Sequence, residues 1–205
     1  MLLRSFQVAK RAQECGDEAD RRLGPGHPLA ECFPMIHNRA IITTEQLDCY
    51  IQRWDTTEEK LRLLSMPAGE RALALKEKEE RLGEVFKSMF IHLVSSVEHG
   101  LRETHRPRGK LSARELSKLK ELLKATKADG WMTEADLELW SFLVTGRNWI
   151  VHNNGHADRN LETTIQGRAF RAKEGVQMQD KVDACLFFTE QATEALGRLA
   201  RAVPP

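Results

Sequence analysis

The stretch VFKSMFIHLVSSVEHGL, residues 85–101, decides the fold class of this chain. Its apolar residues recur at spacings of three and four positions, which is the period of one face of an α-helix. The stripe that they form is wider than a single partner helix can cover. It consists of Val85, Phe86, Met89, Phe90, Leu93, Val94, Val97 and Leu101. We therefore expect one long helix from Glu70 to about His105, with its second half at the centre of the core.

Helical patterns fill most of the remaining chain and predict an all-α helical bundle. Ser112 and Glu115 match a capping box, and Pro25 and Pro28 follow the end of the first helix. Residues 27–42 are expected to be an irregular connection, and a small hairpin is predicted within residues 170–178, around Lys173-Glu174-Gly175. Further helices are expected over residues 1–22, from 43 or 44 to about 65, over 112–129, over 133–152 and over about 179–201.

The composition excludes several classes of protein. The chain has 205 residues, 41% of them hydrophobic, and its 31 basic and 30 acidic residues leave a net charge of +1. This is too apolar for a disordered chain, and the apolar runs are far shorter than the roughly 20 residues that span a bilayer. The four cysteines form no CxxC pair, and Arg4 interrupts any signal peptide. We expect a cytoplasmic protein with no membrane partner, no metal and no cofactor.

Positive charge is concentrated in one segment. Residues 102–128 contain nine basic residues and three acidic ones, although the whole chain is nearly neutral. Lys120, Lys124 and Lys127 share one face of a predicted helix, where the phosphate backbone of a nucleic acid would be attracted. The alternative is a solvated lysine-rich face that binds nothing.

The polar segment GRNWIVHNNG, residues 146–155, follows an apolar helix and holds the residues best suited to chemistry. The planar guanidinium of Arg147 matches phosphate oxygens, and the imidazole of His152 can exchange a proton near neutral pH. Asn148, Asn153 and Asn154 add amides that can orient these groups or bind a base edge or a hydroxyl. Arginine, histidine and amides together suit phosphodiester chemistry that needs no metal.

The spacing of these residues sets a geometric condition. Arg147 and His152 are five positions apart, which is roughly 140° around an ideal helix. On a straight helix they point apart. They can converge if the helix frays or kinks near His152, or in a cleft shared between two subunits.

At these residues the sequence resembles the HEPN superfamily, whose all-α domains carry an Arg-x4–6-His motif, often with Asn, Asp or His after the Arg. Arg147 and His152 match this motif with four intervening residues, Asn148 follows the Arg, and residues 153–155 continue the similarity. The resemblance covers about residues 70–201. It predicts a HEPN-like helical domain over residues 70–205, preceded by an N-terminal helical extension over 1–69.

The resemblance implies a metal-independent endoribonuclease that acts on single-stranded or structured RNA. In that family the 2′-OH of the RNA attacks the adjacent phosphorus and leaves a 2′,3′-cyclic phosphate and a 5′-OH. By position, His152 would be the general acid and base, Arg147 would stabilise the transition state, and Asn148 would orient them. Asn153, Asn154 and the three lysines would contact RNA. The family commonly forms homodimers with one composite cleft, and many members are toxins or antiviral effectors with an antitoxin partner.

Two other interpretations of the motif stay open. Some HEPN-like modules have lost catalysis and only bind nucleotides, RNA or a protein partner. In a purely structural bundle, Arg147 and His152 would simply lie where cations meet the negative end of a helix dipole. Two neighbours have similar alternatives: Trp149 is expected in the core rather than as a base-stacking platform, and His156 at the surface rather than in a metal site with His152.

Overall fold

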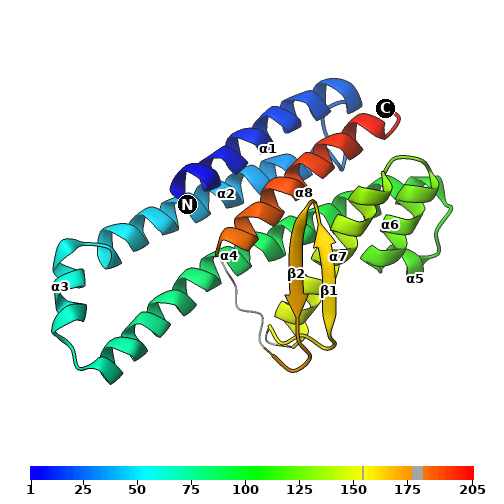
Figure 1. Cartoon of the computed structure of the whole chain (residues 1–205). Coiled ribbons are helices and arrows are strands. Elements are labelled where there is room, and N and C mark those ends of the chain that lie inside the picture. The colour runs from blue at the N-terminus through cyan, green and yellow to red at the C-terminus, as the bar shows by residue number, and fades with distance from the viewer. Residues whose placement is uncertain (154, 177–181) are drawn as a thin grey trace.

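The apolar stripe of residues 85–101 lies within one continuous helix, α4, which runs Ala68–His105 as the sequence predicts. The computed structural model describes residues 1–153, 155–176 and 182–205, and it is an all-α helical bundle (Figure 1). Among the described residues, no helix combines the length and apolar character that crossing a membrane requires. The α-helices that pack most extensively against α4 are α2 (Cys32–Trp54), α6 (Leu119–Ala128), α7 (Glu134–His152) and α8 (Val182–Ala202).

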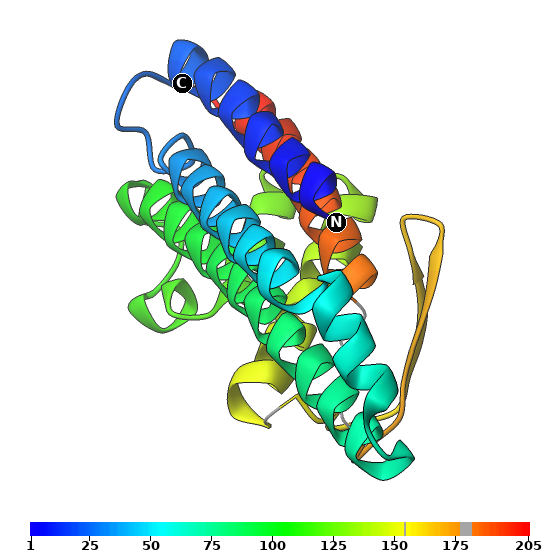
Figure 2. The same ribbon diagram turned by 90° about the vertical axis from the view of Figure 1, so that its left-hand side faces the viewer.

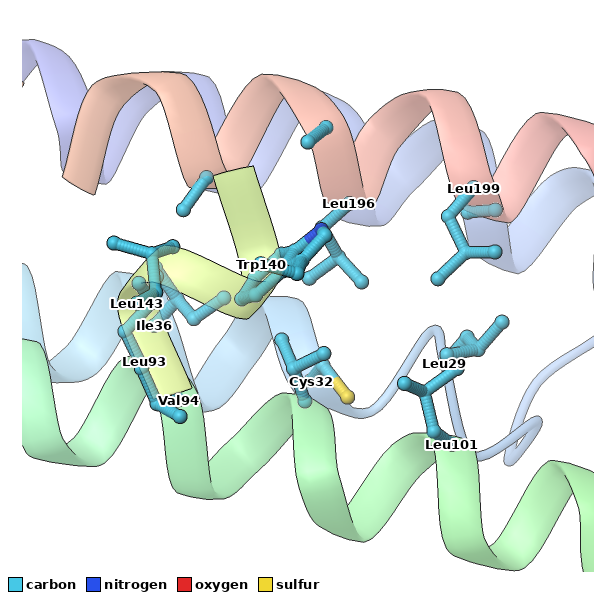
Figure 3. Packing of buried hydrophobic residues seen from close by; sticks show 14 of the residues in the cluster. Leu29, Cys32, Ile36, Leu93, Val94, Leu101, Trp140, Leu143, Leu196 and Leu199 are labelled. Atoms are coloured by element: carbon cyan, nitrogen blue, oxygen red, sulfur yellow. The ribbon is translucent and has the colours of Figure 1, made fainter. Parts of the chain in front are cut away.

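The main hydrophobic core joins the beginning of the chain to its end. It contains Ala12 of α1 (Leu2–Leu23), Cys32 of α2, Val94 of α4, Trp140 of α7 and Leu196 of α8. Figure 3 shows the Trp140 indole between Leu196 and Cys32. Residues 1–69 therefore share a core with the rest of the chain, and the division into an extension and a domain at residue 70 stays a prediction.

Helix α1 lies along α8, as both ribbon views show (Figures 1 and 2). Ion pairs along this contact are partly exposed to solvent, so each contributes only about 0–1 kcal/mol to stability. The burial of apolar side chains between the two helices contributes more. The ion pairs are Arg4–Glu190 at 2.8 Å, Arg201–Glu18 at 3.0 Å, and Arg11–Glu194.

The structure corrects the expected connection over residues 27–42, because α2 begins at Cys32. Pro34 is the third residue of this helix, where an N–H has no partner within the helix and proline is tolerated. The helix expected up to about residue 65 is also interrupted. Thr56 accepts a hydrogen bond from the Glu59 N–H at 3.1 Å and starts a separate helix, α3 (Thr57–Ser65). Helix α3 and the first half of α4 project from the bundle as an arm (Figures 1 and 2).

The helix predicted over residues 112–129 is two helices, α5 (Ala113–Leu116) and α6, which are separated at residues 117 and 118. The predicted capping box is confirmed: the Ser112 hydroxyl accepts from the Glu115 N–H at 3.3 Å, and the Glu115 carboxylate accepts from the Ser112 N–H at 2.9 Å. A short 3-10 helix, η1 (Arg106–Arg108), leads from α4 to this region. Helix α7 begins after Thr133, whose hydroxyl accepts a hydrogen bond from the Asp136 N–H at 3.1 Å.

A hairpin precedes the last helix, but its predicted position is wrong. Strands β1 (Leu161–Ile165) and β2 (Arg168–Ala172) are antiparallel and turn at Gln166-Gly167. Both turn residues have positive φ, 51° and 77°, which is the mirror-image turn that suits the twist of a two-residue hairpin. The predicted turn around Lys173-Glu174-Gly175 lies beyond β2, and residues 177 and 178 lie outside the described part of the chain.

Aromatic packing holds this hairpin on the bundle. Phe170 of β2 meets Phe142 of α7 edge-on, with ring centroids 4.6 Å apart, and lies 6.0 Å from Phe188 of α8. Edge-to-face pairs of this kind add about 0.5–1.5 kcal/mol to the effect of burial. The hairpin is thereby attached to the same two helices that flank it in the sequence.

The close approach of α4 to α2 requires a glycine at position 100. A Cβ there would overlap the Sγ of Cys32 and lie 3.0 Å from the Pro28 carbonyl oxygen. Burial raises the pKa of the Cys32 thiol to about 12, so the thiol stays protonated and donates to the Ser96 carbonyl at 3.2 Å. Nothing lies within 4 Å of the equivalent Cβ at Gly69, near the start of the same helix.

We predict that Gly100→Ala lowers the free energy of unfolding by about 1–3 kcal/mol, because the methyl group overpacks the contact with α2. Gly69→Ala, the matched control, should leave stability unchanged or raise it by up to about 1 kcal/mol, since alanine favours helix. Urea unfolding followed by circular dichroism measures both. Equal stability of the two variants would contradict the close contact.

A buried histidine joins α4 to α6. The hydroxyl of Thr126 donates to the Leu122 carbonyl at 2.8 Å, so it accepts from Nε2–H of His105 at 2.9 Å. Nδ1 of His105 is then unprotonated, and it has no hydrogen-bond partner among the described residues. Burial is the main cause that lowers the pKa of His105; the charges of Arg108 and Lys110 lower it further and that of Asp129 opposes them. The imidazole therefore resists protonation in the folded protein.

Because the pKa of His105 is lower in the folded than in the unfolded state, the unfolded chain takes up the proton first as pH falls. We predict that stability declines as pH drops below about 6.5, by at most about 1.4 kcal/mol between pH 7.5 and 5.5 from this group. His105→Gln should lose that part of the pH dependence. His99→Gln, which changes an exposed histidine of the same helix, should keep it. Urea unfolding at both pH values distinguishes the two outcomes.

Candidate functional site

The predicted motif occupies the last two turns of a regular helix. Helix α7 continues without a break through His152, and Asn153 is its C-cap. The N–H groups of Asn153 and Gly155 both donate to the Trp149 carbonyl, at 3.1 and 2.8 Å. Gly155 has a φ of 82°, which a glycine adopts without strain. The predicted end of the helix is confirmed, while Asn154 itself lies outside the described residues.

Arg147 lies between α7 and α4 with 26% of its side chain exposed. Its Nη2 is 3.6 Å from Oε2 of Glu98 on α4, and its Nη1 donates to the Asn148 amide oxygen at 3.3 Å. Its Nε is buried and has no hydrogen-bond partner in the part of the chain that the structure describes. The guanidinium is thus oriented by weak contacts and retains unused hydrogen-bonding capacity.

His152 lies in a different environment. Its side chain is exposed, as are those of Val151 and Asn153 beside it, and its ring makes no hydrogen bond to any described residue. Because α7 is regular over this stretch, the structure does not bring His152 and Arg147 together within one chain. A kink near His152 is not observed, so a second subunit is the condition left for the two groups to converge.

Trp149 anchors the loop that follows the motif. The indole is 1% exposed, which places it in the core as expected, and its Nε1–H donates to Oδ1 of Asp158 at 2.6 Å. Ala157 extends this attachment, since its N–H donates to the Val176 carbonyl and its carbonyl accepts from the Gly175 N–H. The base of the hairpin is therefore held beside the end of α7.

The predicted RNA-binding lysines lie far from the motif in one chain. Lys127 is paired with Glu134 at 3.3 Å, at the start of α7, and the length of that helix separates Glu134 from His152 by about 27 Å. Lys124 is paired with Glu121 at 3.1 Å. Lys120 is exposed on the same helix.

Six of the nine basic side chains within residues 102–128, all of which the structure describes, are paired with five carboxylates. This supports a charge-paired surface over a nucleic-acid track for that segment. The ion pairs are Arg102–Glu98, Arg106–Glu103, Arg108–Asp129, Lys110–Asp129, Lys124–Glu121 and Lys127–Glu134.

The described residues contain no group of three or more metal-ligating side chains. Nδ1 of His156 is hydrogen-bonded to the Asn153 carbonyl oxygen at 3.0 Å. A cavity of about 390 Å³ lies on the arm, between Trp54, Met66 and Leu73. Along α4, Leu73 is about 37 Å from Glu98, so this cavity is unrelated to the motif.

Glu98 and Asp158 are the site residues that the sequence does not identify. The spacing of Glu98 and Arg102 suggests an ion pair on one helix, but nothing in the sequence connects Glu98 with Arg147 on another. No protein-family model, curated protein or solved structure matches this chain. The resemblance to HEPN domains therefore rests on the motif residues and stays a prediction.

We predict that Asp158→Ala lowers the free energy of unfolding by about 1–3 kcal/mol, because it leaves the buried Trp149 N–H without an acceptor. In a Trp149→Phe background, which has no N–H to satisfy, the same substitution should cost much less. Urea unfolding of the four proteins gives the coupling between the two residues. An equal loss in both backgrounds would show that Asp158 acts in another way.

Proposed function

We propose that this protein is a metal-independent endoribonuclease of the HEPN type, with an active site completed by a second copy of the chain. The observation that carries the proposal is the exposed imidazole of His152, five positions after the Arg147 guanidinium at the end of one helix. In this proposal Asn148 orients the guanidinium, to which its amide oxygen is already bound. Asn153 is exposed at the same helix end and is suited to contact RNA.

The surface of α7 next to the motif is suited to a second copy. Side chains at helical spacing along it are uncharged and at least partly exposed, in a chain in which 30% of residues are charged. Two such surfaces related by a twofold axis would pack without burying charge. The helix ends would then bring two histidines and two arginines to one cleft. The side chains are Ser141, Val144, Thr145, Asn148 and Val151.

A pair of histidines matches the chemistry of RNA cleavage. The 2′-OH attacks the adjacent phosphorus while one imidazole accepts its proton, and the bond from phosphorus to the 5′-oxygen breaks. The other imidazole, protonated, gives its proton to that leaving oxygen. The products are a 2′,3′-cyclic phosphate and a 5′-OH, and the Arg147 guanidinium stabilises the charge on the phosphoryl oxygens in the transition state. Such an enzyme in the cytoplasm would act as a toxin or defence effector and would need a neutralising partner.

One observation favours a second candidate function, a non-catalytic module that binds a nucleotide, RNA or a protein. Glu98 partly compensates the charge of Arg147. This compensation would reduce the stabilisation that the guanidinium gives to a transition state. A module of this kind needs only an anion-binding guanidinium and tolerates the separation of Arg147 from His152. It differs from the nuclease in binding without turnover.

Incubation with single-stranded RNA in EDTA separates these functions. We predict cleavage that leaves cyclic phosphate ends and fails at positions with a 2′-deoxyribose. His152→Ala should reduce the rate by about 10²–10⁴-fold, the usual contribution of an acid–base group. His99→Ala, at another exposed histidine, should not. Light scattering should report two chains per particle.

RNA binding without cleavage by the wild-type protein would establish the second candidate instead. Absence of both RNA binding and cleavage would contradict the nuclease and an RNA-binding module.

A further inference from the structure

Two arginines share one carboxylate at the interface of α4 and α7. Oε1 of Glu98 lies 2.7 Å from Nη2 of Arg102, and Oε2 lies 3.6 Å from Nη2 of Arg147. The side chain of Glu98 is 15% exposed and that of Arg147 is 26% exposed, so Glu98 is the more buried of the two. The three side chains together carry a net charge of +1 in a partly desolvated place.

The two ion pairs are unequal. A separation of 2.7 Å is a charge-assisted hydrogen bond, whereas 3.6 Å is beyond hydrogen-bonding distance. A second hydrogen bond fixes Arg102, because its Nε donates to the Leu116 carbonyl at 2.9 Å. If Arg147 moved away, Glu98 would keep a charged and well-oriented partner. Release of Arg147 would therefore cost little.

We propose that Glu98 is a displaceable counter-ion of Arg147, and that a phosphate group of RNA takes its place when RNA binds. The identification of RNA as the ligand rests on the proposed function. A phosphate can accept two parallel hydrogen bonds from a guanidinium, which the carboxylate at 3.6 Å does not. The Nε of Arg147 is buried and has no partner among the described residues, so it becomes a further donor for the phosphate once the guanidinium moves away from Glu98. Glu98 is thus a positioning residue: it holds Arg147 until RNA arrives and weakens the binding of RNA.

The ratio of two cations to one carboxylate distinguishes this place from the paired lysines Lys124 and Lys127 of helix α6. Lys124 and Lys127 each have a glutamate of their own, at 3.1 and 3.3 Å. A phosphate at those positions would have to separate a balanced pair. At Glu98 the second cation is in excess, so an anion of the ligand completes the charge balance there.

A single-stranded RNA oligonucleotide with 2′-O-methyl groups throughout tests this, because it binds without being cleaved. Fluorescence anisotropy should show that Glu98→Gln tightens its binding about two- to fivefold, the range expected for a partly exposed ion pair. Glu103→Gln is the matched control. It removes a charge from the same helix, but one that is paired with Arg106 at 2.6 Å, so it should have a smaller effect.

Two further variants test the role of each arginine. In an Arg147→Met background, Glu98→Gln should no longer tighten binding. Arg102→Met should weaken binding, because Glu98 would then be paired with Arg147 alone. Arg102→Met also tests the inference if Glu98→Gln unfolds the protein.

The inference is overturned if Glu98→Gln leaves binding unchanged or weakens it, if Glu103→Gln matches its effect, or if the effect survives Arg147→Met. It is also overturned if none of these proteins binds the oligonucleotide. Cleavage of unmodified RNA is measured separately. The predicted pattern of binding without any cleavage would support the counter-ion while contradicting the nuclease.

Discussion

The burial of the wide apolar face of α4 is the constraint on which the rest of this structure depends. One partner helix cannot cover that face, so α2, α8, α6 and α7 all pack against it. This arrangement also determines the chemistry of the motif. Because α7 must cross α4 to bury Trp140 and Leu143, the arginine at its last turns comes to lie beside Glu98.

The features predicted correctly from the sequence are those with local causes. Helix α4, the Ser112 capping box and the end of α7 depend on residues within a few positions of one another. The sequence does not predict the start of α2, because Pro34 resembles a helix breaker and only its place in the first turn makes it acceptable. The sequence does not predict the position of the hairpin turn, because Gln166 adopts a positive φ, which glutamine rarely does.

The candidate site, whose role stays a prediction, also combines local and distant relations. Arg147, Asn148 and His152 follow from a pattern within six residues, and so does the contact between Arg147 and Asn148. Glu98 could not be predicted, because its contact with Arg147 joins residues far apart in the chain. The lysines of α6 also have partners that the spacing of basic residues does not reveal. Their spacing suggests one basic face, but acidic partners that include Glu134 on the next helix neutralise much of its charge.

In the anion site that we propose, the sharing of Glu98 resolves a conflict that any half-buried anion site faces. A guanidinium without a counter-ion would pay a desolvation penalty in the free protein, whereas one with a carboxylate of its own would have little attraction left for phosphate. Two arginines on one glutamate avoid both extremes. Arg102 takes the short hydrogen bond, and Arg147 keeps enough compensation to stay folded against α4. On this argument the geometry of Glu98, more than the exposure of the motif, decides how strongly Arg147 can hold an anion.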